Sequence, residues 1–102
     1  MNQYRQGDVL LVPVSEIPAS ATPQERDKGR VVLAYGEVTG HAHAITKPGV
    51  TRLADGIAEY LSAPEGCTLD HEEHSAIVIA PGNYRIIHQR EYTPEAIVRV
   101  AD

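Results

Sequence analysis

Two histidines stand one residue apart, at His41 and His43, within the stretch GEVTGHAHAIT (residues 36–46). If this stretch is a β-strand, its side chains alternate between two faces, and His41, His43 and Ile45 share one of them. Two imidazoles side by side can offer two nitrogen ligands to one metal ion. The stretch therefore indicates a metal site on an apolar strand.

The remaining histidines lie in two other short stretches. His71 and His74 enclose two glutamates in the sequence HEEH, and His88 lies within YRIIHQREY (residues 84–92). Residues three apart share a face on a helical turn but not on a straight strand, so HEEH must bend if both of its histidines bind one ion. Its glutamates add a possible carboxylate ligand or general base.

All five histidines are candidate ligands of one divalent metal ion, with His41, His43 and His88 as first choices and His71 or His74 completing the shell. Two or three neutral imidazoles and a carboxylate suit Zn, Fe, Mn or Ni. The alternative interpretation is that the histidines face solvent or form hydrogen bonds within the core. The sequence does not decide whether such an ion is catalytic.

A possible substrate pocket is indicated on the run of residues 84–92. On an extended strand, Tyr84, His88, Arg90 and Tyr92 share one face. Tyr84, Arg90 and Tyr92 are therefore candidate substrate-binding residues, and the arginine could clamp a carboxylate or phosphate. The alternative is a strand whose Arg and Glu side chains form cross-strand pairs.

The elements that must position these residues are short strands. Apolar or alternating runs occur at residues 8–14, 30–34, 50–53, 57–61, 67–69, 76–80, 84–92 and 97–100, besides the histidine stretch. Turns rich in Gly and Pro separate the runs, including a hairpin turn at residues 54–56 and a turn at 81–83. These features predict a single all-β domain over residues 1–102, a compact barrel or sandwich of about 7–9 short, mostly antiparallel strands.

Two proline-containing segments modify this plan. Residues 15–29 have prolines, a charge cluster and no periodicity, so they are predicted to be a mobile loop. Within it, Thr22-Pro23 followed by Glu25 could cap one short helical turn. Pro13 lacks a backbone donor, so the strand before it is predicted to end there or to run along a sheet edge.

Composition narrows the possible partners. The net charge of −5 argues against broad binding to nucleic acid or to anionic membranes. The single Cys67 excludes an intrachain disulfide framework and a Cys-rich zinc site. With neither a signal-peptide pattern nor an apolar run of ~18 residues, a cytoplasmic protein is predicted. The expected partner is a small molecule or another protein, and a homo-oligomer is compatible with the sequence.

Two resemblances follow from these motifs. His41-x-His43, and Pro81-Gly82 followed by His88, resemble the two motifs of the cupin superfamily, although the cupin glutamate after the first pair is missing. That resemblance implies a small metal-containing β-barrel enzyme. TGHAH, HEEH and QREY, with an opening QGDVLLVPV, resemble a group of small uncharacterised proteins of bacteria and their phages.

The leading hypothesis is thus a small cytoplasmic β-barrel protein that binds a metal ion. In one reading of this hypothesis, it is a cupin-like enzyme that acts on a small molecule. The alternative is a non-enzymatic phage or host-defence accessory module that binds another protein. Three ordered ligands with an open coordination position and a pocket would favour the enzyme. An exposed apolar patch without a cavity would favour the binding module.

Overall fold

A computed structural model describes residues 2–36 and 40–89 of the protein. Ten β-strands and no α-helix occur within these two ranges. The strands are β1 (Tyr4–Gln6), β2 (Val9–Val14), β3 (Thr22–Pro23), β4 (Val31–Tyr35), β5 (Ala42–Ile45), β6 (Thr51–Ala54), β7 (Glu59–Ala63), β8 (Cys67–Leu69), β9 (Ile77–Ile79) and β10 (Gly82–His88).

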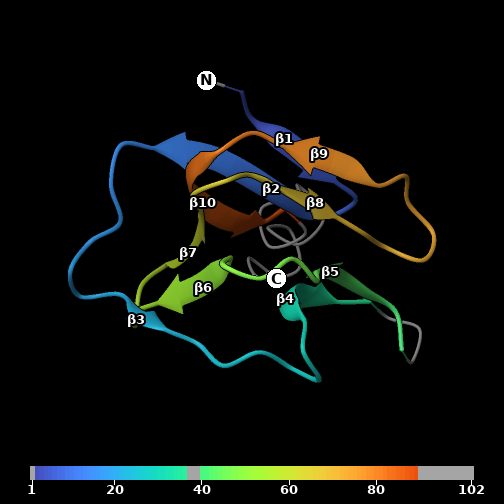
Figure 1. Ribbon diagram of the computed structural model, residues 1–102, viewed down its shortest axis with the longest axis horizontal. Coiled ribbons are helices and arrows are strands. Elements are labelled where there is room, and N and C mark those ends of the chain that lie inside the picture. The colour runs from blue at the N-terminus through green and yellow to red at the C-terminus, as the bar shows by residue number, and fades with distance from the viewer. Residues whose placement is uncertain (1, 37–39, 90–102) are drawn as a thin grey trace, which may run out of the picture.

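The strands form one six-stranded sheet and two two-stranded sheets (Figure 1). The large sheet has the order β1-β2-β10-β7-β6-β3, and β4 pairs with β5 and β8 with β9, all antiparallel. Because β1 and β3 do not pair with each other, the large sheet is not closed into a barrel. The predicted all-β, antiparallel class is confirmed in an open form, and the described residues alone contain ten strands rather than about 7–9.

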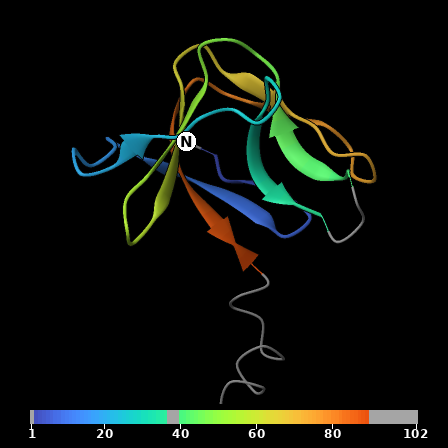
Figure 2. The same cartoon turned by 90° about the horizontal axis from the view of Figure 1, so that it is seen from below.

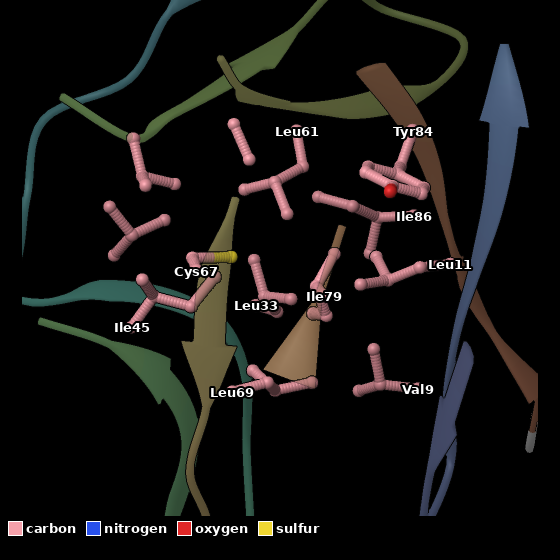
Figure 3. Packing of buried hydrophobic residues seen from close by; sticks show 13 residues of the cluster. Val9, Leu11, Leu33, Ile45, Leu61, Cys67, Leu69, Ile79, Tyr84 and Ile86 are labelled. Atoms are coloured by element: carbon pink, nitrogen blue, oxygen red, sulfur yellow. The ribbon is translucent and has the colours of Figure 1, made fainter. Parts of the chain in front are cut away.

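The core lies between the large sheet and the two small ones, and Figure 3 shows side chains from all three meeting there. Its fully buried members are mostly Leu and Ile, as expected for a chain without Phe or Trp; the largest are Leu11, Ile45, Leu61, Leu69, Ile79 and Val9. Full burial of one such side chain contributes about 1.5–3 kcal/mol. The β4–β5 pair thereby lies across the core from β2, as seen in Figures 1 and 2.

Buried and exposed residues alternate along β10 as predicted, within the part of residues 84–92 that the structure describes. Tyr84 and Ile86 are buried while Arg85, between them, is exposed. Such alternation is the period-two pattern of a strand with one face on the core. The strand ends at His88. The predicted continuation through Arg90 and Tyr92, and the predicted last strand over residues 97–100, lie outside the described residues.

At Pro13, β2 pairs with a neighbouring strand on only one of its two edges. β1 pairs with β2 over Val9–Leu11, whereas β10 pairs with it as far as Val14. The missing donor of Pro13 therefore falls on a stretch with edge character, which is where proline is tolerated in a sheet. Of the two predicted alternatives, the edge position is confirmed.

The helical turn predicted after Thr22 is wrong. Thr22–Pro23 forms β3 and pairs with Leu53 and Ala54 of β6. The backbone N–H of Gln24 also donates to the carbonyl of Arg52 at 2.7 Å. Pairing with a distant strand thus satisfies backbone groups that a local helical turn would have used, and it overrides the capping signal.

Besides the pairing of β3 with β6, Arg26 holds the predicted loop of residues 15–29 in place. The guanidinium of Arg26 donates hydrogen bonds to carbonyls on both sides of the β5–β6 connection and within the loop itself, namely those of Gly29, Thr46, Lys47 and Val50. Ala21 is also buried. The mobility of this loop stays a prediction, and a large movement of the loop would have to break these contacts.

Two features in the second half of the chain differ from the sequence prediction. Residues 76–80 were predicted to form a buried strand, but Val78 in the middle of β9 is 77% exposed because its face points away from the core. β10 begins at Gly82, so the predicted turn at 81–83 is shorter than expected. The predicted hairpin after Ala54 is confirmed as the β6–β7 connection.

Candidate metal centre

A single backbone bridge brings two histidine stretches together. β5 pairs with β4 on one edge, and on the other Ala44 and Asp70 exchange two N–H···O hydrogen bonds of 2.9 Å each. In an antiparallel bridge, the residue before Ala44 faces the residue after Asp70. His43 and His71 are therefore cross-strand neighbours, with ring centroids 4.3 Å apart.

The HEEH stretch bends, as it must if both of its histidines are to share a site. Residues 72–74 form a bend, and His74 returns to within 4.6 Å of His71 and 5.7 Å of His43, measured between ring centroids. One potential ligand nitrogen from each of these three rings lies within 4.8 Å of the other two. Tetrahedral zinc with Zn–N bonds of about 2.1 Å needs nitrogens about 3.4 Å apart. Small side-chain rotations, easiest for the exposed His74, would close the difference.

Gln6 fixes the orientation of His43. The side chain of Gln6 is 3% exposed, and its Nε2 donates to the carbonyls of Leu69 and Ser75, both at 2.9 Å. Its Oε1 therefore faces His43 and accepts a hydrogen bond from Nδ1 at 2.8 Å. In the neutral ring this places the proton on Nδ1 and leaves the Nε2 lone pair for a metal. Because Leu69 and Ser75 flank the loop of residues 70–74, Gln6 also holds both ends of that loop.

Burial keeps the imidazole of His43 in the form that binds metals. His43 is 5% exposed, and this burial is the largest cause that lowers its pKa from 6.5 to about 4, followed by the neighbouring His71 and His74. Only the neutral ring offers a lone pair. At neutral pH, His43 is therefore ready to act as a ligand.

Gly7, in the turn between β1 and β2, lies against the histidine rings. A Cβ atom at this position would lie 2.7 Å from Nε2 of His74 and 3.1 Å from Cε1 of His43. Its φ of +56° is also in the left-handed region that favours glycine. A larger residue here would have to displace the ring of His74 and would adopt a strained backbone conformation.

The glutamates of HEEH attach the loop to the first residue of β5 and to the residue before it. Oε1 of Glu72 accepts from the backbone N–H of Ala42 at 2.9 Å, and this hydrogen bond holds the pKa of the Glu72 carboxyl below its usual range. Oε2 of Glu73 lies 3.0 Å from Nδ1 of His41. His41 thereby reaches only the margin of the cluster, with its ring centroid 6.0 Å from that of His71.

His71 makes a hydrogen bond that metal binding must replace. Its Nδ1 accepts from the backbone N–H of Glu73 at 3.0 Å, which assigns the proton of the neutral ring to Nε2. A metal would either take Nδ1, displacing this N–H, or take Nε2 after the proton moves. Either route costs one local hydrogen bond at an exposed loop, worth about 1 kcal/mol.

The structure groups the histidines differently from the first-choice set. His43, His71 and His74 form the cluster, whereas His88 lies at the end of β10, with Nε2 3.3 Å from Oε2 of Glu59. The prediction treated His41 and His43 as one strand face, but β5 begins only at Ala42. Strand alternation does not specify which strands are neighbours, and this is the physical reason for the difference.

The predicted substrate-binding residues are placed only in part. Tyr84 is buried, its ring packs edge-on against that of Tyr4 at 5.9 Å, and its hydroxyl donates to the carbonyl of Ala80 at 2.5 Å. This environment gives Tyr84 a role in the core. Arg90 and Tyr92 lie outside the described residues. Sequence reasoning did not find Gln6, whose contacts join residues 63 and 69 positions apart.

Fold and site together define a small antiparallel β domain with a candidate three-histidine metal centre. The chain belongs to the family described as Domain of unknown function (DUF8820), whose model matches residues 5–89. The matched segment includes Gln6, Gly7 and all three clustered histidines. The predicted membership of an uncharacterised family is thus confirmed.

No curated protein and no solved structure matches the chain. Within residues 2–36 and 40–89, no helix is long and apolar enough to span a membrane.

Proposed function

We propose that this protein binds one divalent transition-metal ion through His43, His71 and His74. The observation that carries the proposal is the convergence of three imidazole nitrogens within 4.8 Å, one of them from a ring whose other nitrogen is held by a buried amide. Metal-ligating histidines usually have such a partner on the second nitrogen. Zinc suits three nitrogen ligands best, with Fe, Mn and Ni as the other candidates.

A three-histidine set supports an enzyme that acts on a small molecule. Catalytic zinc sites typically use three protein ligands and leave a fourth position for water or substrate. His43 also borders a cavity of about 400 Å³. The exposed large apolar residues Tyr35, Ile57 and Val78 belong to three different elements, β4, the β6–β7 turn and β9, which gives less support to the protein-binding accessory module.

The test uses protein purified without a histidine tag. After equilibration with Zn²⁺ and removal of free metal at pH 7.5, elemental analysis should give one zinc per chain. A chelator should then lower the melting temperature, because bound metal stabilises the native state by mass action. The variant His43→Ala should lose both the zinc and the sensitivity to chelator.

His88→Ala is the matched control, since it removes a partly buried histidine outside the cluster. It should keep stoichiometric zinc. A folded wild type that takes up no zinc, or equal loss of zinc in His43→Ala and His88→Ala, would contradict the proposal.

A further inference from the structure

The cavity that His43 borders follows one edge of β4. Its volume of about 400 Å³ falls within the range of roughly 300–1,000 Å³ typical of ligand sites. Residues 32–35 all line it, although consecutive side chains of a strand point to opposite faces. The cavity therefore borders the edge of the strand rather than one of its faces. β5 pairs with the opposite edge, and no other strand of the described residues pairs with β4, which Figure 2 shows set apart from the large sheet.

Hydrogen bonds on the far side of β5 determine which backbone groups of β4 point to this edge. The N–H and C=O of Ala44 both bond to Asp70, on the side of β5 away from β4. In an antiparallel pair, hydrogen-bonded and non-hydrogen-bonded positions alternate, and two residues that form a non-hydrogen-bonded pair direct their backbone groups away from each other. Val32 is the partner of Ala44 in β4. Its N–H and C=O therefore point to the unpaired edge.

Tyr35 is placed in the same way. Its partner in β5 is Ala42, whose N–H donates to Oε1 of Glu72 at 2.9 Å, on the side away from β4. The N–H and C=O of Tyr35 therefore also point to the unpaired edge. The next residue, Gly36, donates instead toward β5, to the carbonyl of His41 at 2.8 Å, as the alternation requires.

The edge of β4 is less protected from pairing than the edges of the large sheet. Open edges offer backbone groups that need partners, and proteins usually shield them with very short strands, charged side chains, proline or a bulge. The outermost strands of the large sheet, β1 and β3, are three and two residues long and carry Arg5 and Pro23. β4 is five residues long, VVLAY, and of these devices it carries only a bulge, between Val32 and Ala34.

We propose that the unpaired edge of β4 binds a short extended peptide, which joins the β4–β5 sheet through main-chain hydrogen bonds with Val32 and Tyr35. In such strand addition, main-chain hydrogen bonds supply the affinity. The contacts involve no metal, so the inference goes beyond the proposed function and does not depend on it. A peptide bound there would lie in the cavity beside His43, and it is therefore also the class of molecule that the proposed metal centre would meet.

The experiment titrates metal-free protein, in the presence of a chelator, with a blocked pentapeptide of alternating threonine and valine. Nitrogen-15 NMR spectra follow binding and amide hydrogen exchange at each residue. In the free protein, the amides of Val32 and Tyr35 should exchange faster than that of Gly36, which already has a partner. Saturation with peptide should slow both by at least about tenfold. The same peptide methylated at every peptide nitrogen lacks main-chain donors, so it should bind at least about tenfold more weakly.

Two variants test the backbone contact directly. Val32→Pro removes an edge N–H that takes no part in the pairing with β5, so β4 should stay in place while peptide binding weakens about tenfold or more. Val32→Thr is the matched control, because it keeps the N–H and a branched side chain, and it should bind like the wild type. Should Val32→Pro fail to fold, the methylated peptide still tests the same contacts in the wild type.

Three results would overturn this inference and leave the metal site standing. These are no saturable binding of the peptide, equal binding of the methylated peptide, and slowed exchange at residues other than Val32 and Tyr35 alone. Failure of zinc uptake would instead overturn the proposed function and leave this inference standing.

Discussion

The sharpest prediction concerns Gln6, the buried amide behind His43. In Gln6→Ala, the Nδ1–H of His43 and the carbonyls of Leu69 and Ser75 lose their partner. A buried polar group left unsatisfied costs about 1–3 kcal/mol, so the three groups together should cost about 3–5 kcal/mol after partial rehydration at the Ser75 end. This is a large share of the roughly 5–15 kcal/mol that stabilises a domain of this kind.

Metal affinity should fall as well, for a separate reason. Without Gln6, nothing holds the proton of His43 on Nδ1 or keeps the two ends of the loop 70–74 together. Loss of such an outer partner typically weakens metal binding about 10–100-fold. Gln6→Glu provides the comparison, because its carboxylate still accepts from His43 but cannot donate to the carbonyls of Leu69 and Ser75. It should therefore retain the His43 tautomer and still lose stability.

The assay has two parts. Nitrogen-15 NMR of metal-free protein reports which nitrogen of His43 carries the proton, and zinc titration against a competing chelator gives the affinity. We expect the proton on Nδ1 in the wild type and in Gln6→Glu, and exchange between tautomers in Gln6→Ala. A proton on Nε2 of wild-type His43, or zinc affinity in Gln6→Ala within about twofold of the wild type, would refute this account of the site.

Three further predictions follow from single features. Burial lowers the pKa of His43 from 6.5, its value in an unfolded chain, to about 4 in the folded protein. Between pH 6.5 and pH 4 the unfolded chain therefore binds more protons than the folded protein does. The unfolding free energy of metal-free protein should thus fall by up to about 3 kcal/mol as the pH falls through this range. Urea unfolding with chelator present measures this loss, and a flat profile would contradict it. Gly7→Ala should weaken zinc binding at least about tenfold because its methyl group collides with His74, whereas Gly29→Ala, with φ +81° and no atom within 4 Å, should change only stability. Limited proteolysis should cut first within residues 15–29, and initial cleavage within β9 or β10 would show that the core is placed wrongly.

The class of fold was predictable because side-chain alternation is local. Burial of Tyr84 and Ile86 around exposed Arg85 follows directly from the period of a strand. The hairpin after Ala54 was likewise predictable from its turn residues. In that turn, Oδ1 of Asp55 accepts from two backbone N–H groups at 2.8 Å. Such features depend on neighbours in sequence, so the sequence alone is sufficient to specify them.

Tertiary structure determines which histidines form the cluster. The sequence indicated every histidine of the cluster and the need for HEEH to bend, with His41, His43 and His88 as first choices and His71 or His74 completing the set. The bridge between Ala44 and Asp70 instead selects His71, and the bend then brings in His74. Alternation specifies which face of a strand a side chain occupies, whereas the neighbour of that strand is set by pairing across the whole domain. For the same reason, the contact of Gln6 with His43 depends on tertiary structure, because it forms only where β1 lies beside both ends of the loop of residues 70–74.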